Sequence, residues 1–262
     1  MSKSFILGFI AGLVLIIASA VAGFQSQQKD PAQKRKEQEL ALYKTQVVDA
    51  TPVQFGVLTE RQQKHSKLYT SYNLQLSHNK KISKRIKERE STVLGTELLI
   101  GLGPAFESAK PEDFFAEIVK TSDVIIRGKV VKKTSQITED DFFIFTDYDV
   151  TVSEILKNNL ASPIDLGNTV IVTRPGGKIV VDGVVLEFKD HGFLPLPVRG
   201  NEVVLFLKFV PDTGAYQTVE SSGSYEIVGN SLQPLTKEPF PVGVLDNSNS
   251  LLSMIRTILK SK

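Results

Sequence analysis

The chain has 262 residues, no cysteine and a formal net charge of +2. The lack of cysteine excludes a disulfide framework, a thiol nucleophile, a zinc site built on Cys ligands and a bacterial lipid anchor attached to Cys. About 240 residues follow the apolar start of the chain, which is enough for one large domain or for a smaller domain with an extended preceding segment.

The first 24 residues predict the compartment. Lys3 precedes an almost unbroken apolar run over residues 5–24. Twenty helical residues span roughly 30 Å, the thickness of the hydrocarbon core of a bilayer, so the run could be a transmembrane anchor. Small residues spaced A-x-A near its end are also typical of a signal peptide cleaved after Ala20 or Ala22. Both alternatives predict an exported protein of the bacterial cell envelope, anchored in the membrane through residues 5–24 or released as a periplasmic or secreted protein.

Residues 25–95 form a basic segment, with 14 Lys and Arg against 7 Asp and Glu. Basic residues this close to the apolar run conflict with the positive-inside bias, which leaves a cytoplasmic orientation open. Residues 31–46 are good helix formers with a thin apolar stripe. Thr59 and Gln62 are spaced as a capping box, which predicts a helix through Tyr72. Residues 77–91 are too charged to bury much surface, so we interpret 25–95 as a basic helical stalk that is partly disordered.

Residues 96–262 are acidic, with 16 Lys and Arg against 22 Asp and Glu, and they contain the predicted folded core. Pro111 suits the first position of a short helix, and the apolar residues 114, 115, 118 and 119 form one face of it. Runs of β-branched and aromatic residues then predict strands. These runs are residues 123–132, 142–156, 169–174, 178–188, 202–209, 215–220 and 224–235.

The turns indicate an antiparallel sheet. Asp182-Gly183 between two valine-rich runs is a two-residue hairpin signal. From residue 147 to residue 153 the chain alternates strictly, so Tyr148, Val150 and Val152 should face the core while Asp147 and its alternating neighbours face water. At the end of the chain, Asn247 or Ser248 can cap an amphipathic helix over residues 251–259. Packing of this helix on the sheet and contact with a membrane surface are the two alternatives.

The polar clusters do not define a catalytic site. Residues 139–141 with Asp147 and Asp149 are the densest carboxylate group, but they lack the spacing of a calcium loop and fit a solvated hairpin tip. The three histidines, His65, His78 and His191, stand in no metal-ligand spacing. We therefore predict no catalytic, cofactor-binding or metal residues and no cofactor. We also predict no nucleic-acid partner, because the basic residues of 80–89 lack interleaved aromatic residues for base stacking.

The core resembles a known family. The run SDVIIRGKVVKKTSQITEDDFFIFTDYDVTVSEILKNN, followed by PGGKIVVDGVV and VVLFLKFVPDTGAY, resembles an uncharacterised family of exported bacterial proteins familiar from acidobacterial genomes. This likeness covers residues 111–235 and implies no activity. More distantly, the order of an Asp before an apolar strand with Gly-x-Val, then Tyr-x-Val-x-Val, resembles the OB barrels of netrin modules and metalloproteinase inhibitors. That likeness implies only a barrel architecture, because the inhibitors depend on cysteines absent here.

Together these observations predict a mainly β protein. Its fold would be an antiparallel OB-like barrel or sandwich with flanking short helices, preceded by the membrane or signal helix and the stalk. We expect a non-catalytic envelope protein whose β domain binds a ligand or another envelope protein. One alternative is an envelope hydrolase that uses the carboxylates of residues 139–149 or 182–190. The other is a structural module whose stalk and terminal helix both contact lipid.

Overall fold

The computed structural model describes residues 48–70, 80–90, 92–95, 111–189, 192–198, 200–219, 222–236 and 247–261. The predicted membrane or signal segment and the first part of the stalk lie outside these residues. Asp49–Lys262 form one compact unit, which therefore begins inside the segment that we predicted as a stalk. Within the described residues, no helix combines the length and apolar character needed to cross a bilayer.

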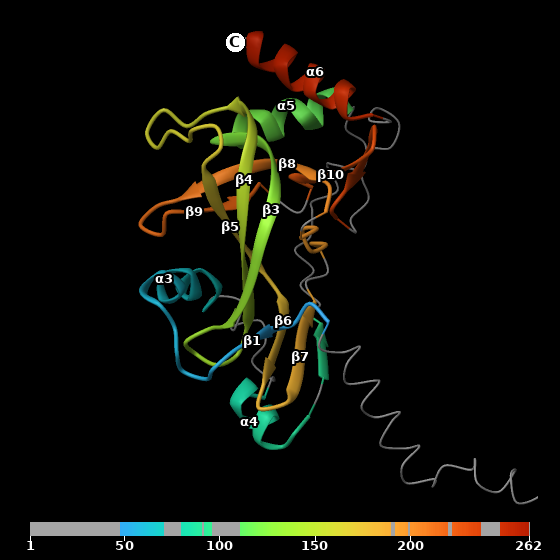
Figure 1. The fold of residues 1–262 in the computed structure, drawn as a ribbon. Coiled ribbons are helices and arrows are strands. Elements are labelled where there is room, and N and C mark those ends of the chain that lie inside the picture. The colour runs from blue at the N-terminus through green and yellow to red at the C-terminus, as the bar shows by residue number, and fades with distance from the viewer. Residues whose placement is uncertain are drawn as a thin grey trace, which may run out of the picture. The chain divides into compact units, whose positions relative to one another are not determined.

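The larger of two sheets contains seven strands in the order β11-β10-β8-β3-β4-β5-β9. The strands are β3 (Val124–Ile137), β4 (Ile144–Lys157), β5 (Thr169–Pro175), β8 (Glu202–Val210), β9 (Ala215–Thr218), β10 (Ser224–Val228) and β11 (Ser231–Pro234). Because β8 also pairs with β9, the pairings of β3, β4, β5, β9 and β8 form a closed cycle (Figure 1). The fold is mainly β, as predicted.

The strand alternation explains one core of this sheet. Tyr148, Val150 and Val152 are buried in a cluster with apolar residues of β3, β5 and β8, as their spacing predicts. The prediction for the opposite face is wrong at Asp147, which is only 2% exposed, whereas Ser153 is exposed. The helix α3 (Glu60–Tyr69) covers the Asp147 end of that face, through contacts that the strand's own sequence does not encode.

The smaller sheet has the order β1-β6-β7-β2. It consists of β1 (Thr51–Pro52), β6 (Gly177–Val181), β7 (Val184–Lys189) and β2 (Thr92–Gly95). The Asp182-Gly183 hairpin is confirmed, and both turn residues have positive φ, as a type I′ turn requires. The expectation of purely antiparallel pairing is wrong: β1 with β6, β2 with β7 and β5 with β9 are parallel pairs.

The early helices correct the predicted stalk. The Thr59–Gln62 capping box is present, but α3 ends at Tyr69. The helix α4 (Ile82–Lys87) buries Ile82 and Ile86 against aromatic residues of the β4 and β7 strands. The expected solvated tract therefore contains a docked helix over its described part. The many charged residues of this tract make it look too polar to pack. The two isoleucines are four positions apart, however, and this spacing is enough to bury one side of a short helix.

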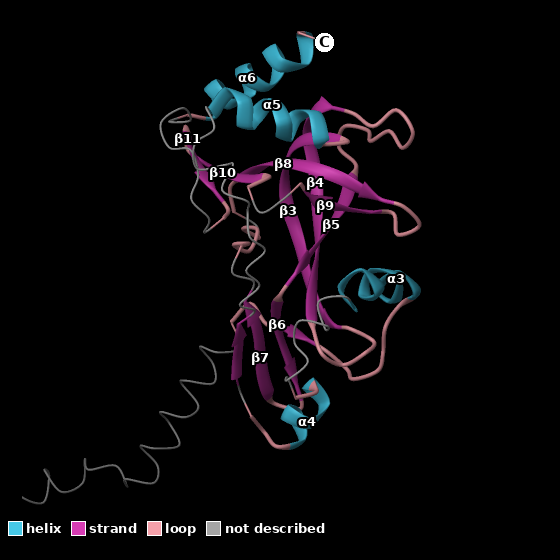
Figure 2. Cartoon of the chain, turned by 180° about the vertical axis from the view of Figure 1, so that it is seen from behind, coloured by secondary structure: helices cyan, strands magenta, loops and turns pink. Residues whose placement is uncertain are grey.

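The helices α5 (Pro111–Thr121) and α6 (Ser248–Lys260) lie beside each other at one end of the larger sheet (Figures 1 and 2). Asn247 caps α6 as predicted, because its side chain accepts the Ser250 N–H at 2.8 Å. Leu251 and Ile255 of α6 are buried with Phe115 of α5 in a third apolar cluster. Packing on the fold thus accounts for the buried face of the terminal helix.

Candidate functional site

A buried His–Asp pair joins α3 to the larger sheet. The Nδ1 atom of His65 lies 2.9 Å from both carboxylate oxygens of Asp147 on β4, and its Nε2 atom lies 3.4 Å from the carbonyl oxygen of Thr213. The side chain of His65 is fully buried. Because both ring nitrogens face backbone or carboxylate oxygens and solvent has no access, this pair holds the helix rather than activating a hydroxyl.

Two further side chains of α3 fasten it to the same region. The Ser66 Oγ accepts the backbone N–H of Glu139 at 2.8 Å, and the Tyr69 hydroxyl donates to Thr173 Oγ1 at 3.0 Å. The Tyr69 ring stacks on Phe145 with 5.4 Å between ring centroids. The helix therefore contacts the β3–β4 turn, strands β4 and β5, and the β8–β9 turn at once (Figure 1).

Sequence reasoning assigned His65 no role. Its partner is 82 residues away, and no local motif marks the pair. One signal was present, because the buried residues Gln62, His65, Ser66 and Tyr69 follow the i, i+3, i+4, i+7 spacing of a packed helix face. Three of these four residues are polar, so the apolar periodicity of the segment does not indicate this buried helix face. His78 and His191 lie outside the described residues.

A small cavity lies beside the start of α3. Its volume is about 160 Å³, and it is enclosed by the loop between β1 and α3 and by the turn between β3 and β4. Gln136 at the end of β3 is 9% exposed, and its Oε1 atom has no hydrogen-bond partner among the described residues. The described lining residues are Val53, Gln54, Phe55, Gly56, Leu58, Gln63, Gln136, Ile137, Thr138, Glu139 and Asp141.

The lining of this cavity is anionic. It includes Glu139 and Asp141, and no lysine or arginine is among its described members. Asp141 is buried, and one of its carboxylate oxygens accepts the Ser83 N–H of α4 at 3.0 Å. Asp140 instead accepts the Thr138 hydroxyl at 2.5 Å. The expected solvated hairpin tip is therefore correct for the exposed Glu139 but wrong for Asp141, because α4 covers that side of the turn.

The other predicted carboxylates do not converge on a metal or hydrolytic centre in the described part of the chain. Asp147 binds His65, and Asp182 occupies the β6–β7 turn with a φ of 48°. Asp190 lies outside the described residues. No group of three or more His, Asp or Glu side chains among the described residues could hold a metal ion.

A buried arginine, Arg174, forms the second polar connection within the larger sheet. Arg174 on β5 donates from Nη1 to the Leu194 carbonyl at 2.8 Å and from Nη2 to Ser224 Oγ. Its guanidinium lies 5.2 Å from the centroid of the Phe193 ring. Burial raises the pKa of the nearby Tyr148 hydroxyl, although the charge of Arg174 works in the opposite direction. These contacts tie β5 to the segment before β8 and to β10, and they leave the cationic group covered by protein.

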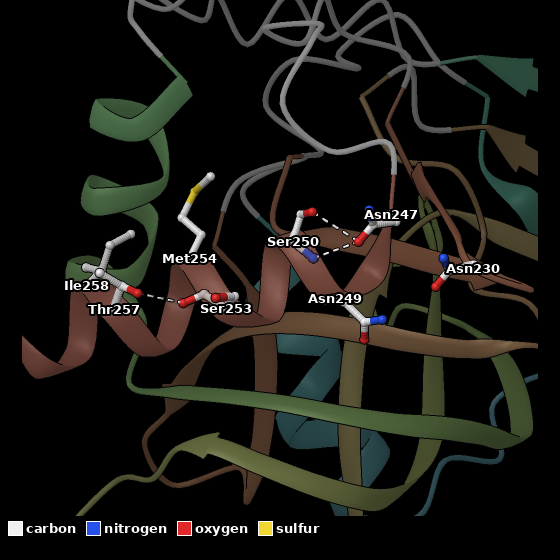
Figure 3. A pocket seen from close by; sticks show the side chains of 8 residues that line it. All are labelled: Asn230, Asn247, Asn249, Ser250, Ser253, Met254, Thr257 and Ile258. Carbon is white, nitrogen blue, oxygen red and sulfur yellow. Dashed lines mark hydrogen bonds between the residues drawn. The ribbon is translucent and has the colours of Figure 1, made fainter.

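An open groove of about 840 Å³ runs along α6 (Figure 3). Three of its polar side chains form local bonds: Ser250 Oγ donates to Asn247 Oδ1 at 3.0 Å, and Thr257 Oγ1 donates to the Ser253 carbonyl at 2.9 Å. Figure 3 shows Met254 and Asn249 on opposite sides of the helix. The labelled groups do not converge on one point, so the cavity beside α3 is the stronger candidate site.

No protein-family model matches the chain, and no curated protein matches it either. The resemblances noted from the sequence therefore remain expectations, and the candidate site stands on its own geometry.

Proposed function

We propose that the chain is an exported, non-catalytic cell-envelope protein whose β domain is an OB-like barrel that binds another envelope protein. The apolar run over residues 5–24 supports export and membrane attachment. The order of strand pairing supports the barrel. Numbered along the chain, β3, β4, β5, β8 and β9 are strands one to five. Around the cycle they follow the order one, two, three, five, four, and the parallel pair is β5 with β9.

Barrels of this type bind their ligands at the loops between strands one and two and between strands four and five. In this chain those loops are the β3–β4 turn and the β8–β9 turn. Glu139 of the first turn bonds to Ser66 of α3, and Thr213 of the second faces His65. The cavity beside α3 is lined by the first of these two turns, which supports a binding site there.

The single observation that carries the proposal is this cavity, with the buried Gln136 side chain in its lining. Its volume of about 160 Å³ falls below the roughly 300–1,000 Å³ of small-molecule and cofactor sites. A space of this size suits one side chain inserted from a partner. Phe55 at its rim is 45% exposed, which provides an apolar contact for the surrounding partner surface.

Photo-crosslinking in intact cells tests this proposal. The full chain is produced in its host with p-benzoylphenylalanine in place of Phe55, and in a matched control with the same residue in place of Leu160. Leu160 is 98% exposed in the loop between β4 and β5 and does not line the cavity. We expect a covalent adduct of defined mass from position 55 that is absent from position 160.

Equal adducts from both positions, or none from position 55, would overturn the binding site. The mass of the mature N-terminus and protease accessibility in the same cells test the compartment independently. Protection of the β domain from external protease both in intact cells and after release of the periplasm would contradict export.

A further inference from the structure

We propose that the outer side of α4 docks the compact unit on an anionic phospholipid surface. This inference rests on the membrane attachment in the proposed function and adds a second contact with the same membrane. The docking surface is the basic face of α4, which consists of Lys81, Lys84, Lys87 and Arg89.

The fold fixes which side of α4 faces water. Ile82 is fully buried and Ile86 is 9% exposed, and both belong to an apolar cluster with residues of β4 and β7. The N–H of Ile82 donates to the Asp141 carbonyl oxygen at 2.9 Å, and the N–H of Ser83 donates to an Asp141 carboxylate oxygen at 3.0 Å. The three lysines of the basic face lie at i, i+3, i+6 spacing, on the side opposite the two isoleucines. The packing therefore holds the basic face outward.

The basic face lacks a counter-charge in the described part of the chain. Its four residues are exposed, and none of them forms an ion pair with a described carboxylate. The two acidic residues at the end of α4 are engaged by other cations: Glu88 and Glu90 pair with Lys80, and Glu90 also lies 3.6 Å from Arg85. Like charges one turn apart repel each other, which costs the folded chain stability. An anionic surface would remove this repulsion.

The form of the basic face selects a membrane as the anionic partner. Its cations are spread along the convex outside of a short helix, which suits an array of headgroups better than one phosphate group. The half-buried Phe142 lies beside it, with its ring centroid 5.6 Å from Lys81 Nζ. An aromatic ring next to lysines is typical of surfaces that rest at the headgroup level. One ring does not provide the stacking platform for successive bases that single-stranded nucleic acid requires.

The place of α4 in the chain brings it near such a surface. Residues 25–48 connect the apolar run to the compact unit. A chain of this length spans at most roughly 85 Å when fully extended, so a unit attached through the apolar run stays within that reach of the headgroups. Attachment raises the effective concentration of a weak surface contact. Each lysine or arginine near an anionic membrane then strengthens that contact about fivefold.

The test measures how close α4 comes to the headgroups in the full chain. Because the chain has no cysteine, a single introduced cysteine can be labelled with a fluorophore. Ser83→Cys places the label on α4, and Glu88→Cys provides a second position at its end. Ser253→Cys on α6 is the matched control, since Figures 1 and 2 show α4 and α6 at opposite ends of the compact unit.

Each labelled chain is reconstituted in vesicles that carry a nitroxide quencher on their headgroups. The vesicles contain phosphatidylcholine alone or phosphatidylcholine mixed with phosphatidylglycerol. We expect quenching at positions 83 and 88 that requires phosphatidylglycerol and is lost in about 1 M NaCl, where the Debye length is about 3 Å. We expect no such change at position 253.

Charge variants separate the basic face from the overall charge of the chain. Replacing Lys84, Lys87 and Arg89 by glutamine should lower the ratio of docked to undocked chain about hundredfold. The melting temperature should stay equal or rise, because repulsion within the basic face is reduced. A control variant with the same change in charge should dock as the natural chain does. It replaces three exposed lysines elsewhere, Lys129, Lys208 and Lys260.

Each outcome decides one point. Equal quenching of α4 in the two lipids, equal loss in the two charge variants, or stronger quenching at position 253 would overturn the docking surface. Release of α4 from the vesicles by an equal charge of oligothymidylate would assign the basic face to nucleic acid and also overturn it.

Flotation of the full chain with vesicles of phosphatidylcholine alone tests the membrane segment separately. If the chain floats but α4 is not quenched, the docking surface is wrong and the membrane attachment stands. If the chain floats only with phosphatidylglycerol and α4 is quenched, the basic face binds lipid and the proposed membrane segment is wrong.

Discussion

His65 and Asp147 form a buried ionisable pair between a helix that precedes the larger sheet and a strand inside that sheet, with 2.9 Å from Nδ1 to each carboxylate oxygen. A buried carboxylate is tolerated when it is paired and is costly when its partner is removed. The pair therefore fixes the position of α3 on the sheet, and its contribution to the free energy of unfolding can be measured.

Removing one member of this pair should cost far more than removing both. We expect His65→Leu to lower the free energy of unfolding by about 3–5 kcal/mol, because the Asp147 carboxylate stays buried without its imidazole. The double variant with Asp147→Leu should recover part of that loss. Urea unfolding followed by circular dichroism measures both. A loss below about 1 kcal/mol in His65→Leu would contradict the role of the pair.

The exposed pair of Lys64 and Glu60 on the same helix is the matched control. Its atoms lie 3.1 Å apart at i, i+4 spacing. Exposed pairs of this kind contribute about 0.3–0.5 kcal/mol, so Lys64→Ala should change the unfolding curve little.

A side chain at Gly177 should disrupt the start of β6. Gly177 has a φ of 148°, and an added Cβ atom would clash with Thr146 Oγ1 and lie 2.7 Å from Ser135 Oγ. The two hydroxyls lie 2.9 Å apart and are buried. We expect Gly177→Ala to cost about 3 kcal/mol by combined strain and overpacking. Gly183 has a φ of 79°, but an added Cβ atom there would meet no other atom within 4 Å. Gly183→Ala should therefore cost only about 1 kcal/mol. Equal losses in the two variants would contradict the close approach at residue 177.

The ion pair of Arg127 and Glu202 should make the free energy of unfolding decrease at acidic pH. Burial raises the pKa of Glu202, but bonds from Ser153 and Arg127 outweigh it and hold the pKa below its usual range. A carboxyl with a depressed folded-state pKa contributes stability above its unfolded pKa of about 4.3, and this contribution is lost as the pH falls through the folded value.

Glu202→Gln should therefore lower stability by about 1 kcal/mol at pH 7, and the loss should shrink steadily as the pH falls below about 4.3 through the folded-state pKa. Urea unfolding at a series of pH values measures this difference. Glu117→Gln, which removes an exposed partner of Lys120 at 3.5 Å, is the control. A difference between Glu202→Gln and the natural chain that stays constant from pH 7 to pH 3 would contradict the assignment.

Lys157 at the end of β4 should stabilise the C-terminus of α5. Its Nζ donates to the carbonyl of Val119 at 2.8 Å and to that of Ser122. A cation at the negative end of a helix dipole is favourable, so Lys157→Met should cost about 1 kcal/mol while it keeps the aliphatic stem. Hydrogen exchange of the Ser122 amide, which bonds to the Ile118 carbonyl, should become faster. Unchanged exchange in this variant, or equal acceleration in the exposed Lys120→Met, would contradict this role.

The sequence predicted those parts of the fold that depend on neighbouring residues. The hairpin at Asp182, the caps at Thr59 and Asn247 and the core face of β4 all follow from local spacing. The predicted strand over residues 123–132 was too short. β3 continues to Ile137 through a polar stretch, because β4 pairs with it along that length.

The candidate site could not be predicted because its parts are far apart in the sequence. Gln136 is one polar residue in a polar stretch, and it becomes notable only because the loop after β1 and the β3–β4 turn enclose it. Likewise, His65 acquires a role only from Asp147 and Thr213. The role of each residue depends on tertiary packing, and the periodicity within one segment cannot predict such packing.

The order β1-β6-β7-β2 also fixes a sequence of events during synthesis. β1 and β2 leave the ribosome early, but their partners begin only at Gly177 and Val184. β1 cannot pair until the growing chain has passed Val181, and β2 cannot pair until it has passed Lys189. The late hairpin therefore supplies both partners, and each early strand closes a long loop of the chain when it is added to one side of that hairpin.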